Sequence, residues 1–164
     1  MTSTVVQRPD PKLDLVLERV VDVPPRLVFA AWTRPELLKR WFTGAPWEMT
    51  ECEIDLCPGG VFRWVMRGPE GKVVENTGCC LEIVENEKFA WTGALGPGWR
   101  PRPVPPGSFL SSVVIALEPR GAGTKYTALV VHGDEAARRQ HEEMGFHERW
   151  GKTLDQLVAL AKTL

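Results

Sequence analysis

The sequence lacks an excess of charge of either sign. Its 164 residues contain 20 Lys and Arg against 21 Asp and Glu, which gives a formal net charge of −1. Proteins that bind nucleic acid or an anionic membrane surface generally carry a basic excess or a run of basic residues, and this sequence has neither. We therefore expect no nucleic-acid partner.

Long apolar segments are also absent. No run reaches the roughly 18 consecutive apolar residues that a membrane-spanning helix needs. Residues 1–10 contain no apolar core of the kind found in secretion signals. We expect a cytoplasmic protein without membrane insertion.

Cysteine is scarce, with only Cys52, Cys57, Cys79 and Cys80. In a cytoplasmic protein these are expected to be reduced thiols. They form no C-x-x-C pair and the histidines are distant in sequence, so we expect no metal site. Cys57 has no basic neighbour that would lower the pKa of its thiol, which argues against a cysteine nucleophile.

The common catalytic and nucleotide-binding signatures are missing as well. There is no G-x-S-x-G, no glycine-rich phosphate loop and no dinucleotide fingerprint. The stretch from His141 to His147, HEEMGFH, resembles the H-E-x-x-H of zinc proteases. However, the residue four positions after His141 is Gly145, so two imidazoles do not share one helix face. We assign no catalytic residue and no cofactor.

The aromatic composition is uneven, because the sequence contains seven tryptophans but a single tyrosine. The tryptophans are spread from Trp32 to Trp150 and do not form a local motif. Two interpretations stay open at this point. The rings either fill a core or line a cavity for an apolar ligand.

The hydrophobic pattern predicts a single domain over residues 13–164, after a flexible tail over residues 1–12. Two short helices are expected after a first strand. One begins near Pro25, and the other spans residues 35–42, with Thr33 as the first residue of a capping box.

Alternation with a period of two predicts strands on both sides of these helices. The strands are expected over residues 13–23, 49–56, 62–67, 72–84, 88–94, 108–118 and 124–132. Residues 95–107 interrupt this alternation. The segment contains five prolines, which stiffen the chain around Trp99. This segment is interpreted either as a lid or binding loop, or as a stiff surface loop.

Residues 134–164 predict a long amphipathic helix. From residue 146 the apolar positions recur at intervals of three and four, and they form one stripe of Phe146, Trp150, Leu154, Leu157, Ala161 and Leu164. Asp134 is suited to cap the start of this helix. Gly145 and Gly151 each weaken a helix, which indicates either a bend near Gly145 or a surface that comes close to this helix.

Together these elements predict an α+β fold in which a curved antiparallel sheet of about seven strands encloses the long C-terminal helix. The two short helices lie between strands one and two and close one end of the sheet. Because a straight helix cannot fill a strongly curved sheet along its whole length, we expect a cavity between them.

Four stretches of the sequence resemble a known family. They are VFAAWTRPELLKRWF, CEIDLCPGGVFRWVMRGPEG, LEIV and HEEMGFHERWGKTLDQL, which begin at residues 28, 52, 81 and 141. The order of elements resembles the helix-grip fold of the START-like (SRPBCC, Bet v 1-like) superfamily. The local sequence is similar to its branch related to the C-terminal domain of the activator of the Hsp90 ATPase. The resemblance implies the fold but leaves the function open, because the superfamily includes ligand carriers, polyketide cyclases and cochaperone domains.

Our leading interpretation is a protein that binds a hydrophobic small molecule, aromatic or lipid-like, between the sheet and the C-terminal helix. His132 and His147 are candidates to orient a polar end of this ligand. The full predicted lining is Trp41, Phe62, Trp64, Trp91, Phe109, Tyr126, His132, Phe146, His147, Trp150 and Leu154.

Two alternatives stay open. One is a cyclase- or hydrolase-like enzyme that uses the same cavity, and the other is a cochaperone-like module with a chaperone as its partner. A carrier should have an interior cavity, and an enzyme should bring two or more polar groups together there. An interaction module should instead have a sizeable exposed apolar patch.

Overall fold

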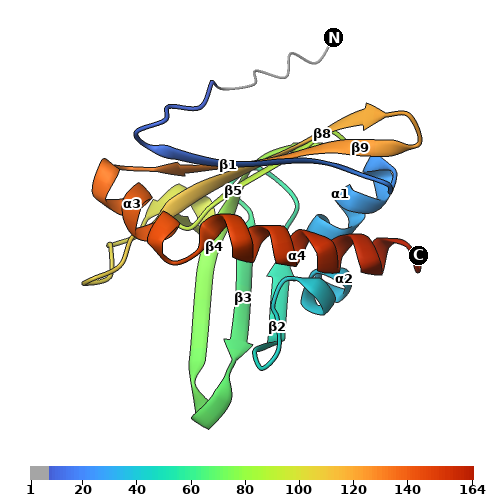
Figure 1. Ribbon diagram of the computed structural model, residues 1–164. Coiled ribbons are helices and arrows are strands. Elements are labelled where there is room, and N and C mark those ends of the chain that lie inside the picture. The colour runs from blue at the N-terminus through green and yellow to red at the C-terminus, as the bar shows by residue number, and fades with distance from the viewer. Residues whose placement is uncertain (1–7) are drawn as a thin grey trace.

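The computed structural model describes residues 8–164 and has an α+β fold built on one antiparallel sheet (Figure 1). Its seven strands lie in the order β1-β9-β8-β5-β4-β3-β2, which confirms the predicted sheet. Their bounds are Asp14–Val21 (β1), Glu48–Ile54 (β2), Val61–Arg67 (β3), Val73–Val84 (β4), Lys88–Thr92 (β5), Ser111–Arg120 (β8) and Gly123–His132 (β9). The predicted tail lies partly outside the described residues, since residues 1–7 are not among them.

Four α-helices are present in residues 8–164. They are α1 (Pro25–Thr33), α2 (Pro35–Trp41), α3 (Glu135–Glu143) and α4 (Phe146–Ala161). α4 crosses the sheet, with α1 and α2 near its C-terminal end and α3 at its N-terminal end (Figure 1). Within the described part of the chain, no helix combines the length and the apolar character needed to cross a membrane.

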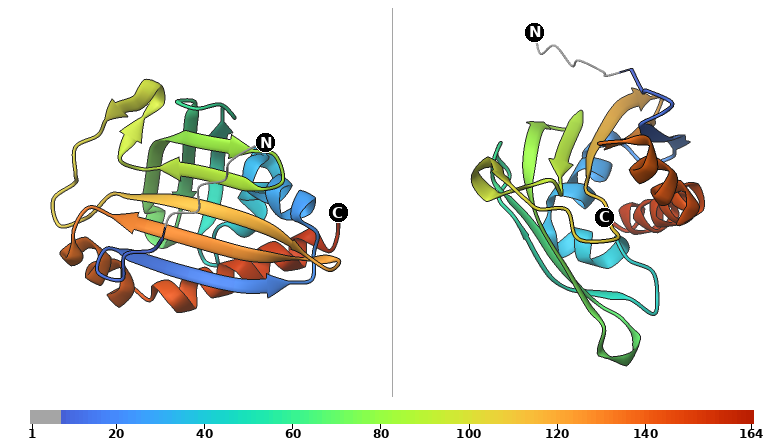
Figure 2. Two further views of the ribbon diagram at one scale, coloured as in Figure 1. Left: turned by 90° about the horizontal axis from the view of Figure 1, so that it is seen from above. Right: turned by 90° about the vertical axis from the view of Figure 1, so that its left-hand side faces the viewer.

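The sheet is curved around α4, as the helix-grip prediction requires. β2, β3 and β4 turn away from the direction of β1 and β9, and α4 lies on the concave side (Figure 2). We call the side that faces α4 the inner face and the opposite side the outer face. Alternate residues of the central strands supply the inner face, and its buried members include Phe62, Phe89, Trp91, Val113 and Ile115.

The C-terminal segment is two helices rather than one. Gly145 has a φ of 87°, a left-handed conformation that glycine adopts at little cost, and it separates α3 from α4. The predicted bend at this residue is therefore confirmed. The cap at Asp134 is confirmed too, since its side chain accepts a hydrogen bond from the Ala137 backbone N–H at 2.7 Å.

The predicted capping box at Thr33 is wrong. Thr33 is the last residue of α1, and its hydroxyl donates to the Phe29 carbonyl oxygen at 2.7 Å. Arg34 occupies the N-cap position of α2 without a side-chain hydrogen bond. Only one residue separates α1 from α2, so Thr33, which was expected to cap α2, is instead the last residue of α1.

The proline-rich segment is more ordered than the pattern suggests. It forms two short paired strands, β6 (Leu95–Gly96) and β7 (Arg100–Pro101), around a single 3-10 turn at Pro97–Trp99. The Gly98 backbone N–H donates to the Gly59 carbonyl oxygen at 2.8 Å, which fixes this turn over the outer face. Residues 102–110 then pass the end of the sheet and lead into β8.

Candidate ligand-binding site

The aromatic side chains divide into two clusters. The inner aromatic cluster comes from α1, α2, β3 and β5 and consists of Trp32, Trp41, Phe42, Phe62, Trp64, Phe89 and Trp91. The mouth cluster comes from the segment just before β8 and from β9, α3 and α4. It consists of Phe109, His132, His141, Phe146, His147 and Trp150. Among the described residues, no ring contact joins one cluster to the other.

Close packing holds the inner aromatic cluster together. The Phe62 and Trp91 rings are stacked with centroids 4.6 Å apart, and Trp32 meets Trp41 edge-on at 4.9 Å. Trp41 donates its indole N–H to the Ala31 carbonyl oxygen at 2.9 Å. These rings are buried in the end of the molecule closed by α1 and α2, so that end is a filled core.

Tyr126 and Leu154 belong to the same filled region. Tyr126 is 2% exposed, and its hydroxyl accepts the Trp32 indole N–H at 3.1 Å. Burial raises the pKa of Tyr126, so its hydroxyl stays protonated at neutral pH. Leu154 is also 2% exposed. Both predicted lining residues therefore contribute to packing rather than to an open wall.

A pair of histidines organises the mouth cluster. His132 Nδ1 lies 2.7 Å from the Leu13 carbonyl oxygen, and His132 Nε2 lies 2.9 Å from His141 Nδ1. Because a carbonyl oxygen only accepts, His132 Nδ1 must donate, and its Nε2 accepts from His141 Nδ1–H. The hydrogen-bond chain thus leaves His141 Nε2 as the unprotonated nitrogen.

Both members of this pair are neutral at pH 7. Burial lowers the pKa of His132 below its usual value. Burial, together with the neighbouring His132, lowers the pKa of His141 to about 4. At neutral pH the pair therefore offers hydrogen-bonding nitrogens but no positive charge.

His147 does not take the place expected for it. Its side chain is 58% exposed, and its Nε2 lies 3.6 Å from a carboxylate oxygen of Glu142 on the surface. The expectation that His147 orients a ligand in the interior is wrong. Phe146 and Trp150 pack inward on α4, and His147, about 100° around the helix from Phe146, lies on the solvent side.

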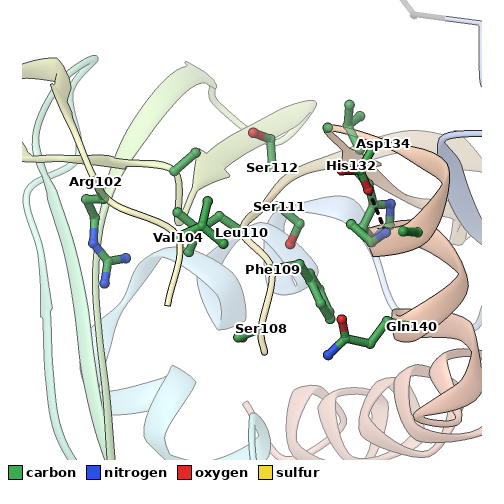
Figure 3. A pocket seen from close by; sticks show the side chains of 15 residues that line it. Arg102, Val104, Ser108, Phe109, Leu110, Ser111, Ser112, His132, Asp134 and Gln140 are labelled. Carbon is green, nitrogen blue, oxygen red and sulfur yellow. Dashed lines mark hydrogen bonds between the residues drawn. The ribbon is translucent and has the colours of Figure 1, made fainter. Parts of the chain in front are cut away.

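A pocket of about 520 Å³ lies beside the mouth cluster, at the end of the sheet near α3 (Figure 3). Two of the predicted ligand residues, Phe109 and His132, line it. Gln140 closes part of its rim by donating to the Gly107 carbonyl oxygen at 3.1 Å. The remaining lining residues are Ala94, Arg102, Val104, Ser108, Leu110, Ser111, Ser112, Val131, Gly133, Asp134, Ala136 and Ala137.

Three aromatic residues of the two clusters are only partly buried. Trp64 on β3 belongs to the inner aromatic cluster, while Phe109 and Trp150 belong to the mouth cluster. Phe146 is 1% exposed and packs against Trp150 with ring centroids 5.2 Å apart. Trp64, Trp150 and Phe109 therefore present ring surface that the core does not use.

The cysteine thiols are poorly suited to nucleophilic chemistry. Burial raises the pKa of the Cys52 thiol to about 11 and that of the Cys80 thiol to about 12. Burial also raises the pKa values of Cys57 and Cys79. A thiol attacks only as its thiolate, so these groups are inert at neutral pH.

A second hollow, of about 410 Å³, lies on the outer face across β1, β9 and β8. Its lining mixes apolar residues such as Val114 and Leu129 with charged ones such as Glu18 and Lys125. The Lys125 ammonium lies 3.7 Å from a Glu18 carboxylate oxygen. The outer hollow is therefore partly occupied by a surface ion pair.

Comparison with known proteins places the chain among proteins of one family. The model of the family described as Activator of Hsp90 ATPase homolog 1-like protein matches residues 22–162. A solved structure from Nitrosomonas europaea is 44% identical with a TM-score of 0.89, and the match covers 96% of this chain and 99% of that one. No curated protein matches the chain significantly.

More distant solved structures share the fold. A protein from Rhodobacter sphaeroides is 24% identical with a TM-score of 0.81, covering 96% of this chain and 97% of that one. A protein from Mycobacterium smegmatis is 22% identical with a TM-score of 0.74, covering 96% of this chain and 95% of that one. The fold is therefore retained where most of the sequence has changed.

Proposed function

We propose that this chain, which belongs to the family of activator of Hsp90 ATPase homolog 1-like proteins, binds a hydrophobic small molecule between the inner face of its sheet and α4. The ligand enters at the end of the sheet near α3, through the pocket that Phe109 and His132 line. Its apolar body lies between the inner aromatic cluster and the mouth cluster.

One observation carries this proposal. The aromatic residues form two internally packed clusters that make no ring contact with each other in residues 8–164, and Trp64, Phe109 and Trp150 are only partly buried. A flat apolar molecule between these rings covers surface that water otherwise wets. Burying about 200 Å² of apolar surface contributes ~5 kcal/mol before the costs of association.

The test is a titration of native protein with the neutral dye N-phenyl-1-naphthylamine, followed by dye fluorescence and tryptophan emission. Phe109→Ala removes a ring from the pocket wall, and we expect it to weaken binding about fivefold, or ~1 kcal/mol. Trp99→Ala is the matched control, because Trp99 is 48% exposed on the outer face and belongs to neither cluster.

Near-UV circular dichroism must accompany each titration, because loosely packed protein also binds such dyes. Equal affinities for Phe109→Ala and Trp99→Ala would place the dye outside the proposed site. Well-packed wild-type protein that binds no dye at all would remove the basis for a carrier function.

Catalysis is the second candidate, and the His132–His141 pair is the observation that favours it. A base held by an oriented partner is the arrangement that general-base catalysis uses. However, a pKa of about 4 makes His141 a weak base at pH 7, and this favours binding over catalysis. Hydrolysis of naphthyl esters that is lost in His141→Gln but retained in His147→Gln would reverse this order.

A further inference from the structure

Three buried nitrogen atoms on the inner face have no hydrogen-bond partner within residues 8–164. They are the indole Nε1 atoms of Trp64 and Trp91 and the amide Nδ2 of Asn76. All three are donors, and none is an acceptor. Buried donors without partners are rare in folded proteins because their lost hydration is not replaced, so three together indicate a missing acceptor.

These donors share one region of the sheet. Trp64 and Asn76 are direct cross-strand partners on β3 and β4, so their side chains lie on the same face. Trp91 stacks on Phe62, which stands two residues before Trp64 on the same face of β3. The three N–H groups therefore belong to the wall formed by β3, β4 and β5.

Arg102 fixes the orientation of the Asn76 amide. Its Nη1 lies 3.3 Å from Asn76 Oδ1 and 2.8 Å from the Gly93 carbonyl oxygen. A guanidinium can only donate, so the Asn76 oxygen must face Arg102 and the NH₂ group must point away from it. The unpartnered donor at Asn76 is thus a consequence of the hydrogen-bond geometry.

Arg102 also brings a positive charge that no carboxylate of residues 8–164 neutralises by an ion pair. Two acidic residues of the neighbouring strands, Glu51 on β2 and Glu75 on β4, instead pair with Arg63. Arg102 lines the pocket at the sheet end, and its side chain extends from the loop on the side opposite His132 (Figure 3).

Gly93 leaves space beside this group. A Cβ atom at that position would lie 3.4 Å from Asn76 Oδ1, 3.8 Å from the Ser111 carbonyl oxygen and 4.0 Å from Arg102 Nη1. A larger side chain there would extend into the region between the loop and the inner face.

We infer that the ligand is a carboxylic acid, whose carboxylate is bound by the unpartnered N–H donors of this wall, with the Arg102 guanidinium holding the Asn76 amide and supplying a nearby positive charge. A group that only accepts hydrogen bonds and carries a negative charge complements a site made of donors and one cation. This inference rests on the proposed function, because the apolar body of the acid occupies the space between the two aromatic clusters.

The experiment compares two probes with the same ring, 1-naphthaleneacetic acid and 2-(1-naphthyl)ethanol, by calorimetry and tryptophan emission at pH 7. The wild type should bind the acid at least tenfold more tightly than the alcohol. Asn76→Leu and Arg102→Gln should each reduce affinity for the acid at least fivefold, while affinity for the alcohol changes less than twofold. Arg100→Gln is the matched control, because Arg100 is exposed on the same loop.

A second readout does not depend on substitutions in the site. The indole ¹H–¹⁵N signals of Trp64 and Trp91, assigned with Trp→Phe variants, should move downfield when the acid binds, and that of Trp99 should not. Binding of both probes with equal affinity would overturn the carboxylate inference and leave the proposed function standing. Failure of both probes to bind would count against the proposed function itself. A preference for the acid that survives Asn76→Leu and Arg102→Gln would also overturn the inference.

Discussion

Acidification from pH 7 to pH 4 is expected to destabilise the fold through His141. Burial and the neighbouring His132 lower the pKa of His141 in the folded protein to about 4, against 6.5 for an ordinary histidine. Between these values the unfolded chain binds more protons than the folded one. The free energy of unfolding therefore falls as pH falls through this window, and the His141 contribution is fully present above pH 6.5.

The size of the effect follows from the same two values. A fully buried group with this difference would contribute ~3 kcal/mol. The His141 ring is only partly buried and solvent screens it, so we expect about 1–2 kcal/mol. His132, which has Asp14, Asp134 and Arg138 nearby, also has a lowered pKa and adds to the loss in the same direction.

The assay is urea unfolding at several pH values for three proteins. In His141→Gln the amide can still donate to His132 Nε2, but it does not titrate, so the fall between pH 6.5 and pH 4 should be smaller than in the wild type by about 1–2 kcal/mol. His147→Gln is the control, because His147 is exposed, and its fall should match that of the wild type. Identical pH dependence in the wild type and His141→Gln would refute the reasoning.

Two further predictions concern α4 and α3, the helices that carry residues of the mouth cluster. Trp150→Ala should lower the free energy of unfolding by about 2 kcal/mol in urea melts, below the 3–5 kcal/mol typical of a fully buried aromatic, because Trp150 is only partly buried. A loss within the range of a surface change would show that its packing against Phe146 contributes nothing. Asp134→Ala should cost ~1 kcal/mol in thermal melts by removing the cap of α3, whereas Asp134→Asn should cost less than half of that.

Much of the architecture was predictable because it depends on local pattern. Alternation over residues 108–118 and 124–132 predicted the β8–β9 hairpin, which pairs from Ser111 with His132 to Arg120 with Gly123. The stripe that begins at Phe146 predicted the inward side of α4, and Gly145 marked the bend before it. Resemblance to one family, carried by four stretches, agreed with the match over residues 22–162.

Only the tertiary structure decided which polar groups meet. His132 and His141 were both visible in the sequence, but their hydrogen bond depends on the angle at which α3 leaves β9. His147 lies beside the inward stripe of α4, and only the packing of that helix on the sheet decided that its side chain stays on the surface.

The same holds for the candidate ligand wall. Asn76 and Arg102 are 26 residues apart, and neither belongs to a recognisable motif. Strand register places Asn76 beside Trp64, and the path of the proline-rich loop carries Arg102 back to it. Hydrophobic periodicity depends on residues that are close together in the chain, so it can be recognised from the sequence alone. The pairing of distant polar groups depends on strand register and loop path, which the sum of long-range contacts determines.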